Sequence, residues 1–455
     1  MALGKRKCEE QSGWVATTEL PVSPGHPFYQ RLNRLLDEAK FDEEVESLCR
    51  PYYADRVGRP GIPPGVYFRM LFVGYFEGLD SQRAIAWRCH DSRSLQTFLG
   101  FSVTEETPDH SSLTVIRKRL PLGIHEQVFA KVLCIAQEKK LLKGQSVAVD
   151  STLIEAEAAM KAIVRRDSGD DWKEYVRKLA AEEGIENPTD EELRKFDRKR
   201  KGKKVSNAEW FNPHDPDAKI AKMKDGRTHL AYKTEHAVDV KSDLVLAAGV
   251  YPADEADTQT LPQTLTMAQA NLLLADSEAE IKDAVADKGY HSNDTLTWCQ
   301  SFGIRTYIPE RESPHGRRWT DKSEEEKRAV YNNRRRVRGK RGKALGRLRS
   351  EYTERSFAHV CETGGARRSR LRELVNVAKR YLMYVAARNL GVMMRALFNM
   401  GTPRGLQAEG EASPCAMGVI GVALFRPWRS VRRRWAELNT YAADRSLPAR
   451  AKHAA

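Results

Sequence analysis

The sequence predicts an α/β protein in which an amino-terminal all-α region precedes a mixed sheet with flanking helices and charged insertions. Apolar residues recur at helical spacing through most of residues 26–143. From residue 144 onward, short β-branched runs alternate with helical segments. Strands that alternate with helices along a chain form parallel strands joined by crossover helices. A length of 455 residues leaves room for two or three domains.

The amino-terminal part divides into a flexible basic arm, residues 1–25, and a helical domain, residues 26–143. Residues 66–79 are apolar on nearly every side and predict the buried central helix of this domain. The segment 107–120 begins with capping residues and ends in a basic turn, and we expect it to bind DNA because a helix fits the major groove. A plain dimerisation module explains the same helices equally well. The DNA-binding residues expected in this segment are Arg117, Lys118 and Arg119.

The α/β domain is predicted to span residues 144–400, followed by a tail, residues 401–455. Its elements follow the order strand, hairpin, helix, strand, helix, strand, helix. Two charged insertions interrupt it, at about residues 157–227 and 311–349. The predicted strands are 146–156, a hairpin formed by 228–240 and 243–254, a short run ending in DAVAD, and 304–309.

The charge of the chain favours a polyanionic partner. The net charge is +14 and the pI about 9.4, and nucleic acid is the usual partner of such a protein, although a merely soluble basic protein has the same composition. The strongest basic run, residues 334–349, contains nine Lys or Arg and no acid. We expect it to bind the DNA backbone. The contacts expected there are Arg334, Arg335, Arg336 and Arg338.

The cysteines and the amino terminus indicate a cytoplasmic protein. Seven cysteines are scattered without a CxxC pair, which excludes zinc-ribbon and thioredoxin-like sites and fits reduced thiols. The first residues lack the apolar run of a signal peptide. No stretch of roughly 18 apolar residues predicts a membrane span, so we expect no membrane partner.

Two short apolar strands each end in an aspartate, Asp150 in VAVD and Asp287 in DAVAD. Ligand sites in open α/β sheets lie beyond the carboxyl ends of parallel strands. Two carboxylates placed there repel each other unless a cation neutralises them, and Mg²⁺ takes one or two protein carboxylates together with phosphate and water. A helix is the expected source of a third acid. Glu354 is the candidate, because Phe357 and Val360 would pack its helix on the sheet.

At this point the sequence resembles a known family, the DDE transposases of bacterial insertion sequences. These proteins have an RNase H-like catalytic core and an amino-terminal helical domain. The resemblance covers most of the chain, from about GRPGIPP to RNLGVMMRALF. Its matching stretches are GRPGIPPGVYFRMLFVGYFEGLDSQRAIAWRC, PDHSSLTVIRKRL, VAVDSTLIEA, DPDAKIAKMKDGRTHLAYKTEHAVD, DEADTQTL, ADKGYHSNDTL and ERSFAHVCETGGARR.

The resemblance implies a magnesium-dependent enzyme that cleaves and rejoins DNA. Asp150 follows the opening strand, Asp287 stands in D-K-G-Y and Glu354 precedes R-x-F, so these three acids are the implied catalytic and metal-binding residues. Two Mg²⁺ ions about 4 Å apart, for which Mn²⁺ can substitute, would clamp the attacking and leaving oxygens. The implied partners are double-stranded DNA, as terminal inverted repeats and target, and a second copy of the chain in a homodimer on DNA.

One position departs from the family pattern. Many relatives carry Lys or Arg seven residues after the glutamate, where it contacts DNA phosphate, and here that residue is Cys361. Other basic side chains are expected to supply this contact. The expected replacements are Arg355, Arg367 or Arg368, and Lys288, next to Asp287, is expected to make a separate phosphate contact.

The remaining polar residues near the predicted site receive structural interpretations. Asp239, Asp254 and Asp257 are interpreted as turn or capping residues, and Lys233 lies on a strand expected to turn one face to solvent. The three acids of the site should converge to within about 4–8 Å and, without metal, splay through mutual repulsion.

Two other functions fit part of the sequence. An RNase H-like nuclease would hydrolyse DNA without strand transfer, and the helical amino-terminal domain and basic insertions argue against such a minimal enzyme. A non-catalytic DNA-binding regulator would not need acids at two strand ends and on a helix. Replacing Asp150 with Asn separates the regulator from the enzymes, since binding would persist and cleavage would vanish.

Overall fold

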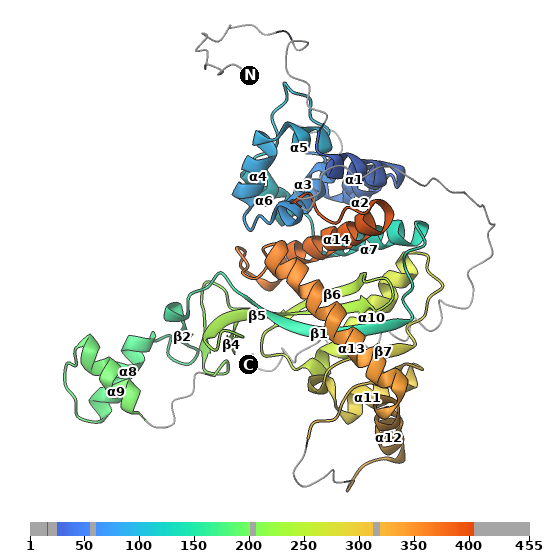
Figure 1. Ribbon diagram of the computed structural model, residues 1–455. Helices are drawn as coiled ribbons and strands as arrows, with labels where there is room; N and C mark the ends of the chain where they lie inside the picture. Colours follow the sequence, from blue (N-terminus) through green and yellow to red (C-terminus); the bar gives the residue numbers. More distant parts are fainter. Residues whose placement is uncertain (1–15, 17–24, 55–60, 201–205, 313–318, 405–455) are drawn as a thin grey trace, which may run out of the picture.

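The computed structural model describes residues 16, 25–54, 61–200, 206–312 and 319–404. A group of helices lies above a twisted sheet, and further helices cover the two faces of that sheet (Figure 1). Most of the predicted amino-terminal arm and nearly all of the predicted tail lie outside the described residues. The amino-terminal elements are α1 (Pro27–Glu38), α2 (Phe41–Cys49), the 3₁₀ turn η2 (Arg50–Tyr52), α3 (Pro64–Glu77), α4 (Gln82–Asp91), α5 (Arg93–Phe98), α6 (His110–Arg119) and α7 (Leu122–Glu138).

Helix α3 is the buried centre of the helical region, as its composition predicts. Every residue from Tyr67 to Phe76 is buried. The one charged residue within this buried stretch, Arg69, donates to Asp42 at 2.9 Å and to Asp37 at 3.0 Å, so the buried charge is paired. Pro64 occupies the first turn, where the missing N–H costs no hydrogen bond.

The helical region and the α/β region share one continuous apolar core. Helix α3 packs against α14 (Leu374–Phe398), and α7 packs against both α14 and α10 (Asp257–Leu274). Helix α7 therefore contacts the α/β region extensively, although the sequence groups it with the amino-terminal helices.

The sheet has six strands in the order β4–β5–β1–β7–β8, with β6 paired to β5. Strands β4, β5, β1 and β6 are joined by antiparallel pairings, whereas β1, β7 and β8 run parallel. The predicted mixed α/β sheet is thereby confirmed. The strands are β1 (Ser146–Glu155), β4 (Lys219–Lys222), β5 (Thr228–Asp239), β6 (Val245–Pro252), β7 (Asp283–Val285) and β8 (Arg305–Tyr307).

The β5–β6 hairpin is closed by an aspartate, as the sequence suggests. Asp239 accepts hydrogen bonds from the backbone N–H of Gly144 at 3.0 Å and from the Ser242 hydroxyl at 2.6 Å. Asp243 adopts a left-handed conformation, φ 61°, in the turn. Asp239 therefore fixes the turn and the start of β1 together, which confirms its interpretation as a turn residue.

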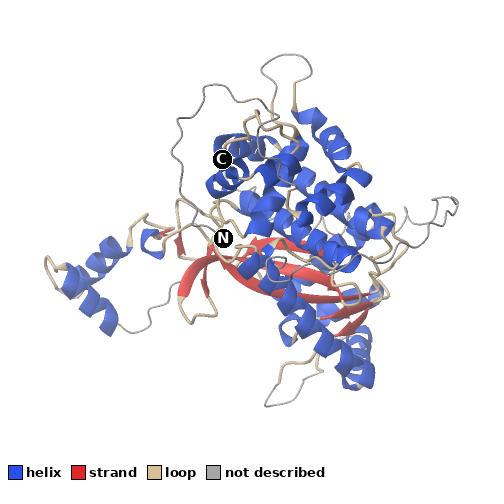
Figure 2. Ribbon diagram, turned by 45° about the horizontal axis from the view of Figure 1, so that its top comes forward, coloured by secondary structure: helices blue, strands red, loops and turns tan. Residues whose placement is uncertain are grey.

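Two sets of helices cover the two faces of the sheet (Figure 2). Helix α10 contacts β5 and β6 on one face, with α11 (Asn293–Ser301) beside it. Helix α13 (Lys340–Phe357) crosses the other face over β1 and β7, and α14 packs over β6 (Figure 1). The basic run 334–349 forms the end of α12 (Glu324–Arg338) and the first half of α13, so it is part of the layer that covers the sheet.

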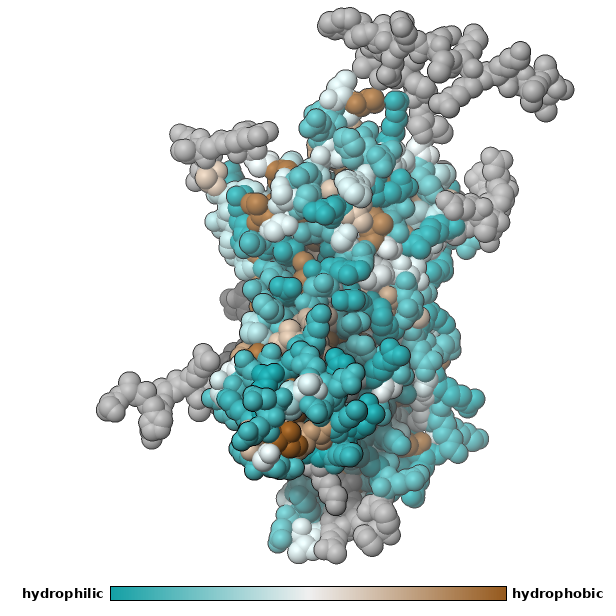
Figure 3. All heavy atoms as spheres, turned by 90° about the vertical axis from the view of Figure 1, so that its left-hand side faces the viewer, coloured by the Kyte–Doolittle hydropathy of each residue, from teal (hydrophilic) through white to brown (hydrophobic). Residues whose placement is uncertain are grey.

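The charged insertion after β1 projects from the body of the protein (Figure 1). Its helices α8 (Trp172–Glu182) and α9 (Asp190–Lys199) enclose a small core of their own, made by Val176, Ala180 and Leu193. On the side from which it projects, the surface is largely hydrophilic with scattered apolar spots (Figure 3). The insertion also contains the 3₁₀ turn η3 (Met160–Ala162) and the paired strands β2 (Val164–Arg165) and β3 (Trp210–Phe211).

None of the helices in the described part of the chain combines the length and the apolar composition needed to cross a membrane.

Candidate active site

The parallel register of β1 and β7 brings Asp150 and Asp287 to the same level of the sheet. Ser146 pairs with Asp283 and Ala148 with Val285. Two residues further along each strand, the chains reach Asp150 and Asp287. Ala148 and Val285 both pack beneath α13, and side chains two apart on a strand share a face. Asp150 therefore lies in the middle of β1 and not at a strand end as predicted, because β1 continues to Glu155, whereas Asp287 follows the end of β7. The pairing of β1 with β7 still brings the two acids to the same level of the sheet.

Asp150 is held from α13. Its Oδ2 accepts hydrogen bonds from Arg349 Nη1 at 2.8 Å and from Thr353 Oγ1 at 3.1 Å. Arg349 and Thr353 are four residues apart and share one face of the helix. The backbone N–H of Ser151 donates to Asp150 Oδ1 at 2.9 Å. Burial raises the pKa of Asp150 above its usual value, and the negative charge of Asp287 raises it further, while Arg349 lowers it.

Asp287 caps the 3₁₀ turn η4 (Lys288–Tyr290), and its Oδ1 accepts from Gly289 N at 2.7 Å. A side chain at Gly289 would collide with two carboxylates. Its Cβ would lie 2.7 Å from Asp257 Oδ2 and 2.8 Å from Asp287 Oδ1. Glycine at this position therefore lets the loop pass between two acids.

Glu354 lies on α13 directly after Thr353, which bonds to Asp150. Successive helical residues point about 100° apart, so Glu354 points to one side of the direction that Thr353 takes toward Asp150, and it is exposed. Within the described residues, no three His, Cys, Asp or Glu side chains lie close enough together to hold a metal ion as they stand. The repulsion between Asp150 and Asp287 and the presence of Arg349 at Asp150 both favour such an open arrangement.

The end of α13 is fixed by a buried histidine. His236 pairs with Asp150 across the β1–β5 ladder and stacks on Phe357 with ring centroids 4.2 Å apart. Its two ring nitrogens lie 2.9 Å from Ser356 Oγ and 2.8 Å from Tyr381 Oη. Burial lowers the pKa of His236 well below its usual value, so the ring is neutral. A π-helix, η5 (Ala358–Thr363), follows at once, and such segments are frequent at functional sites.

A cleft of about 1060 Å³ opens along the second half of β1, lined by Ser151 to Leu153 and Glu155 but by neither Asp150 nor Asp287. Gly289 and Asp257 line it, so it reaches the loop that carries Asp287. Its walls mix both signs of charge. The basic lining residues are Lys222, Lys224, His229, Lys233, His291, Arg311 and Arg367, and the acidic ones are Glu155, Asp225, Glu255, Asp257 and Glu362.

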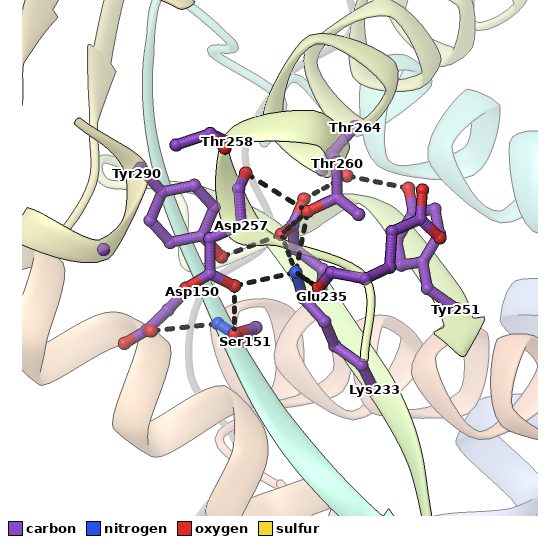
Figure 4. A network of polar contacts seen from close by, with 12 residues as sticks. Asp150, Ser151, Lys233, Glu235, Tyr251, Asp257, Thr258, Thr260, Thr264 and Tyr290 are labelled. Atoms are coloured by element: carbon purple, nitrogen blue, oxygen red, sulfur yellow. Dashed lines mark hydrogen bonds and ion pairs between the residues drawn. The ribbon is translucent and has the colours of Figure 1, made fainter. Parts of the chain in front are cut away.

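On the opposite face of the sheet, beneath α10, a second acid is enclosed by donors (Figure 4). Glu235 is fully buried and pairs with Ser151 across the ladder. It accepts hydrogen bonds from Thr260 Oγ1 at 2.7 Å, from Tyr290 Oη at 2.8 Å and from the Thr264 hydroxyl. Burial raises the pKa of Glu235, and these donors oppose that shift.

The basic residues expected to bind DNA fall into two groups. Arg117 lies in the last turn of α6 and is buried, whereas Lys118 and Arg119 in the same turn are exposed. Exposed residues of the basic run are Arg335 and Arg338. Lys288, which follows Asp287, is exposed as well. Contacts with protein groups occur in both groups. Arg119 lies over the ring of Tyr53, and Arg335 donates to Asn332. Arg334 pairs with Glu310, Arg336 bonds to the Thr306 carbonyl, Arg355 pairs with Glu351, Arg367 with Glu362, and the exposed Arg368 with Glu157.

The position that departs from the family pattern is interior. Cys361 is buried, and burial raises the pKa of its thiol to about 11. Of the residues expected to replace the missing basic side chain, Arg367 is the one that lines the cleft, beside Glu362.

Several residues of the site were missed by the sequence interpretation. Lys233 was expected on a partly solvent-facing strand, but it is buried, because β5 is covered on both faces. Asp257 was interpreted as a turn or capping residue, but it forms an ion pair with Lys233 at 2.7 Å. Arg349 and Thr353, which hold Asp150, were not singled out. A usable signal existed in Lys233 and Glu235, which carry opposite charges two positions apart and so share one face of β5.

The sheet order, with one acid on β1 and another just after β7, fits an RNase H-like core. Residues 145–390 match the family described as Transposase DDE domain, and residues 18–119 match the family described as Transposase domain (DUF772). The first match spans more than half of the chain, so this protein belongs to the DDE transposases. No curated protein and no solved structure matches the chain.

Proposed function

We propose that this transposase cleaves DNA at the inverted terminal repeats of an insertion sequence and joins the freed ends to target DNA. Asp150, Asp287 and Glu354 are the catalytic acids in this proposal. The single observation that supports it most is the β1–β7 register, which pairs Ala148 with Val285, two residues before Asp150 and Asp287 respectively.

The residues present fit a pair of Mg²⁺ ions. All three side chains offer carboxylate oxygens, the ligands that Mg²⁺ prefers. Positive charge is already accommodated at Asp150, where Arg349 Nη1 lies 2.8 Å from Oδ2. When bound, the ions would stabilise the attacking and leaving oxygens of an in-line phosphoryl transfer.

The protein's own groups orient the acids and receive the DNA. Thr353 and the Ser151 amide each hold one oxygen of Asp150, which fixes the plane of its carboxylate. Lys288 stands exposed next to Asp287, where it would bind a phosphate near the scissile bond. Arg349 would exchange its carboxylate partner for DNA phosphate as the site is filled.

Recognition of the element's ends is assigned to the amino-terminal helices. Contacts to a scissile phosphate carry little sequence information, so base contacts must come from elsewhere. Lys118 and Arg119 at the exposed end of α6 are the best-placed candidates. Because two ends must be held together for joining, a homodimer on DNA is part of the proposal.

The experiment that tests this function is a joining reaction with labelled terminal-repeat DNA, a target plasmid and Mg²⁺. The expected result is nicking at the repeat end followed by covalent joining to the plasmid, both lost in Asp150→Asn. Cleavage without joining would favour the nuclease, and binding without cleavage would favour the regulator.

A further inference from the structure

An ion pair between the buried Lys233 and the partly exposed Asp257 lies near Asp150, on the α10 face of the sheet (Figure 4). Lys233 Nζ lies 2.7 Å from Asp257 Oδ1, 3.8 Å from Glu235 Oε2 and 2.9 Å from Thr260 Oγ1. The side chain of Lys233 is only 4 % exposed. Removing a lysine charge from water is costly, and such a pair adds little net stability over apolar packing. A role in placing its neighbours explains the pair better than stability does.

The first neighbour that the pair places is Asp150. Asp257 Oδ1 accepts a second hydrogen bond, from Ser151 Oγ at 3.1 Å. The backbone N–H of the same serine donates to Asp150 Oδ1 at 2.9 Å. Asp257 therefore holds, from behind the sheet, the residue whose amide holds Asp150.

The second neighbour is the loop of Asp287. Asp257 Oδ2 and Asp287 Oδ1 lie 2.7 Å and 2.8 Å from the position that a Cβ on Gly289 would occupy. The next residue, Tyr290, is buried and donates to Glu235 at 2.8 Å, and Glu235 lies beside Lys233. The same charged group thus fixes the loop just after Asp287.

We propose that Lys233 and Asp257 are positioning residues that set the relative orientation of Asp150 and Asp287, and so the affinity of the site for divalent cations. The inference rests on the proposed function of those two aspartates. Its physical basis is that carboxylates orient correctly toward a cation only when neighbouring groups hold them, and losing such a neighbour lowers metal affinity about 10- to 100-fold.

The experiment measures Mn²⁺ binding by calorimetry on the full-length protein, with thermal unfolding as a second readout. Lys233→Met and Asp257→Asn should each weaken Mn²⁺ binding by about 10- to 100-fold while DNA affinity stays unchanged. Lys131→Met is the matched control, because Lys131 is also buried and paired, with Glu44 at 2.5 Å, but lies on α7. It should lower the Tm and leave Mn²⁺ affinity unchanged.

If Lys233→Met does not fold, Ser151→Ala is the variant that tests the inference. It removes one hydrogen bond to Asp257 from a partly exposed side chain and should weaken Mn²⁺ binding about fivefold. Unchanged Mn²⁺ affinity in folded Lys233→Met, or in Ser151→Ala where the first is unfolded, would overturn the inference. Asp150→Asn separates the two proposals: if it still binds Mn²⁺ and cleaves DNA, the proposed function itself is wrong.

Discussion

The two faces of the sheet carry carboxylates in opposite states. On the α13 face, Asp150 is partly open and faces a single arginine, and Glu354 is exposed. On the α10 face, Glu235 has no exposed surface and three hydroxyl donors. Successive side chains of a strand point to opposite faces of the sheet, so Asp150 and Ser151, which are neighbours in sequence, lie in different environments. The difference indicates that the α13 face is open to a charged ligand, whereas the α10 face holds in place the strands that carry the acids.

The largest expected effect is on the open α13 face, where a substitution should remove catalysis without unfolding the protein. Replacing Glu354 with Gln should lower strand cleavage by about 10³-fold or more, because a catalytic group is removed. DNA affinity and the Tm should stay near those of the unmodified protein. Glu351→Gln is the matched control, since Glu351 is an exposed acid one turn earlier on α13 that pairs with Arg355. Comparable cleavage by the two variants would remove Glu354 from the site.

On the closed face we expect the reverse, a loss of stability. Glu235→Ala leaves the hydroxyls of Thr260, Thr264 and Tyr290 without their acceptor and should lower the free energy of unfolding by about 3 kcal/mol or more. Glu354→Ala, an exposed change, should stay within about 0.5 kcal/mol. Urea unfolding measures both. Equal destabilisation by these two variants would break the contrast between the faces.

The basic run on α12 and α13 provides a third, intermediate effect. Arg335 and Arg338 are exposed, whereas Arg334 and Arg336 bond to Glu310 and Thr306. If the exposed pair contacts phosphates, replacing both with Ala should flatten the slope of log affinity against log salt by about 2. Binding titrations between about 50 and 200 mM salt measure the slope. Replacing Arg334 and Arg336 should leave it unchanged, and an identical slope for all variants would assign the whole run to packing.

The smallest expected effect is on the stability of the metal-free protein. The pKa of Asp150 is raised in the folded state, so its contribution to stability is present below the unfolded pKa and is lost as the pH rises through the folded pKa. Asp150→Asn should therefore raise the Tm slightly at neutral pH in the presence of a chelator, and the gain should vanish in acid. Calorimetric scans from about pH 3 to 7 cover the range. A gain that grows toward acid would contradict the sign of the shift.

The order of the secondary-structure elements was determined by the sequence, because short β-branched runs and helical periodicity are local signals. Strands β1, β5, β6, β7 and β8 and the buried helix α3 were anticipated from such patterns. Asp150 and Asp287 were proposed because apolar runs followed by an acid are visible in the chain, but β1 continues past Asp150 to Glu155. The family match over residues 145–390 agrees with the predicted transposase family.

Tertiary structure alone decided which charges are open and which are enclosed. Lys233 and Asp257 are 24 positions apart in sequence, and only the packing of α10 on β5 makes them partners at 2.7 Å. The same is true of Arg349 and Asp150, which meet because α13 crosses β1. Hydrophobic periodicity identifies the buried face of an element, but the free energy of a buried charge depends on which donors and acceptors the rest of the chain brings to it.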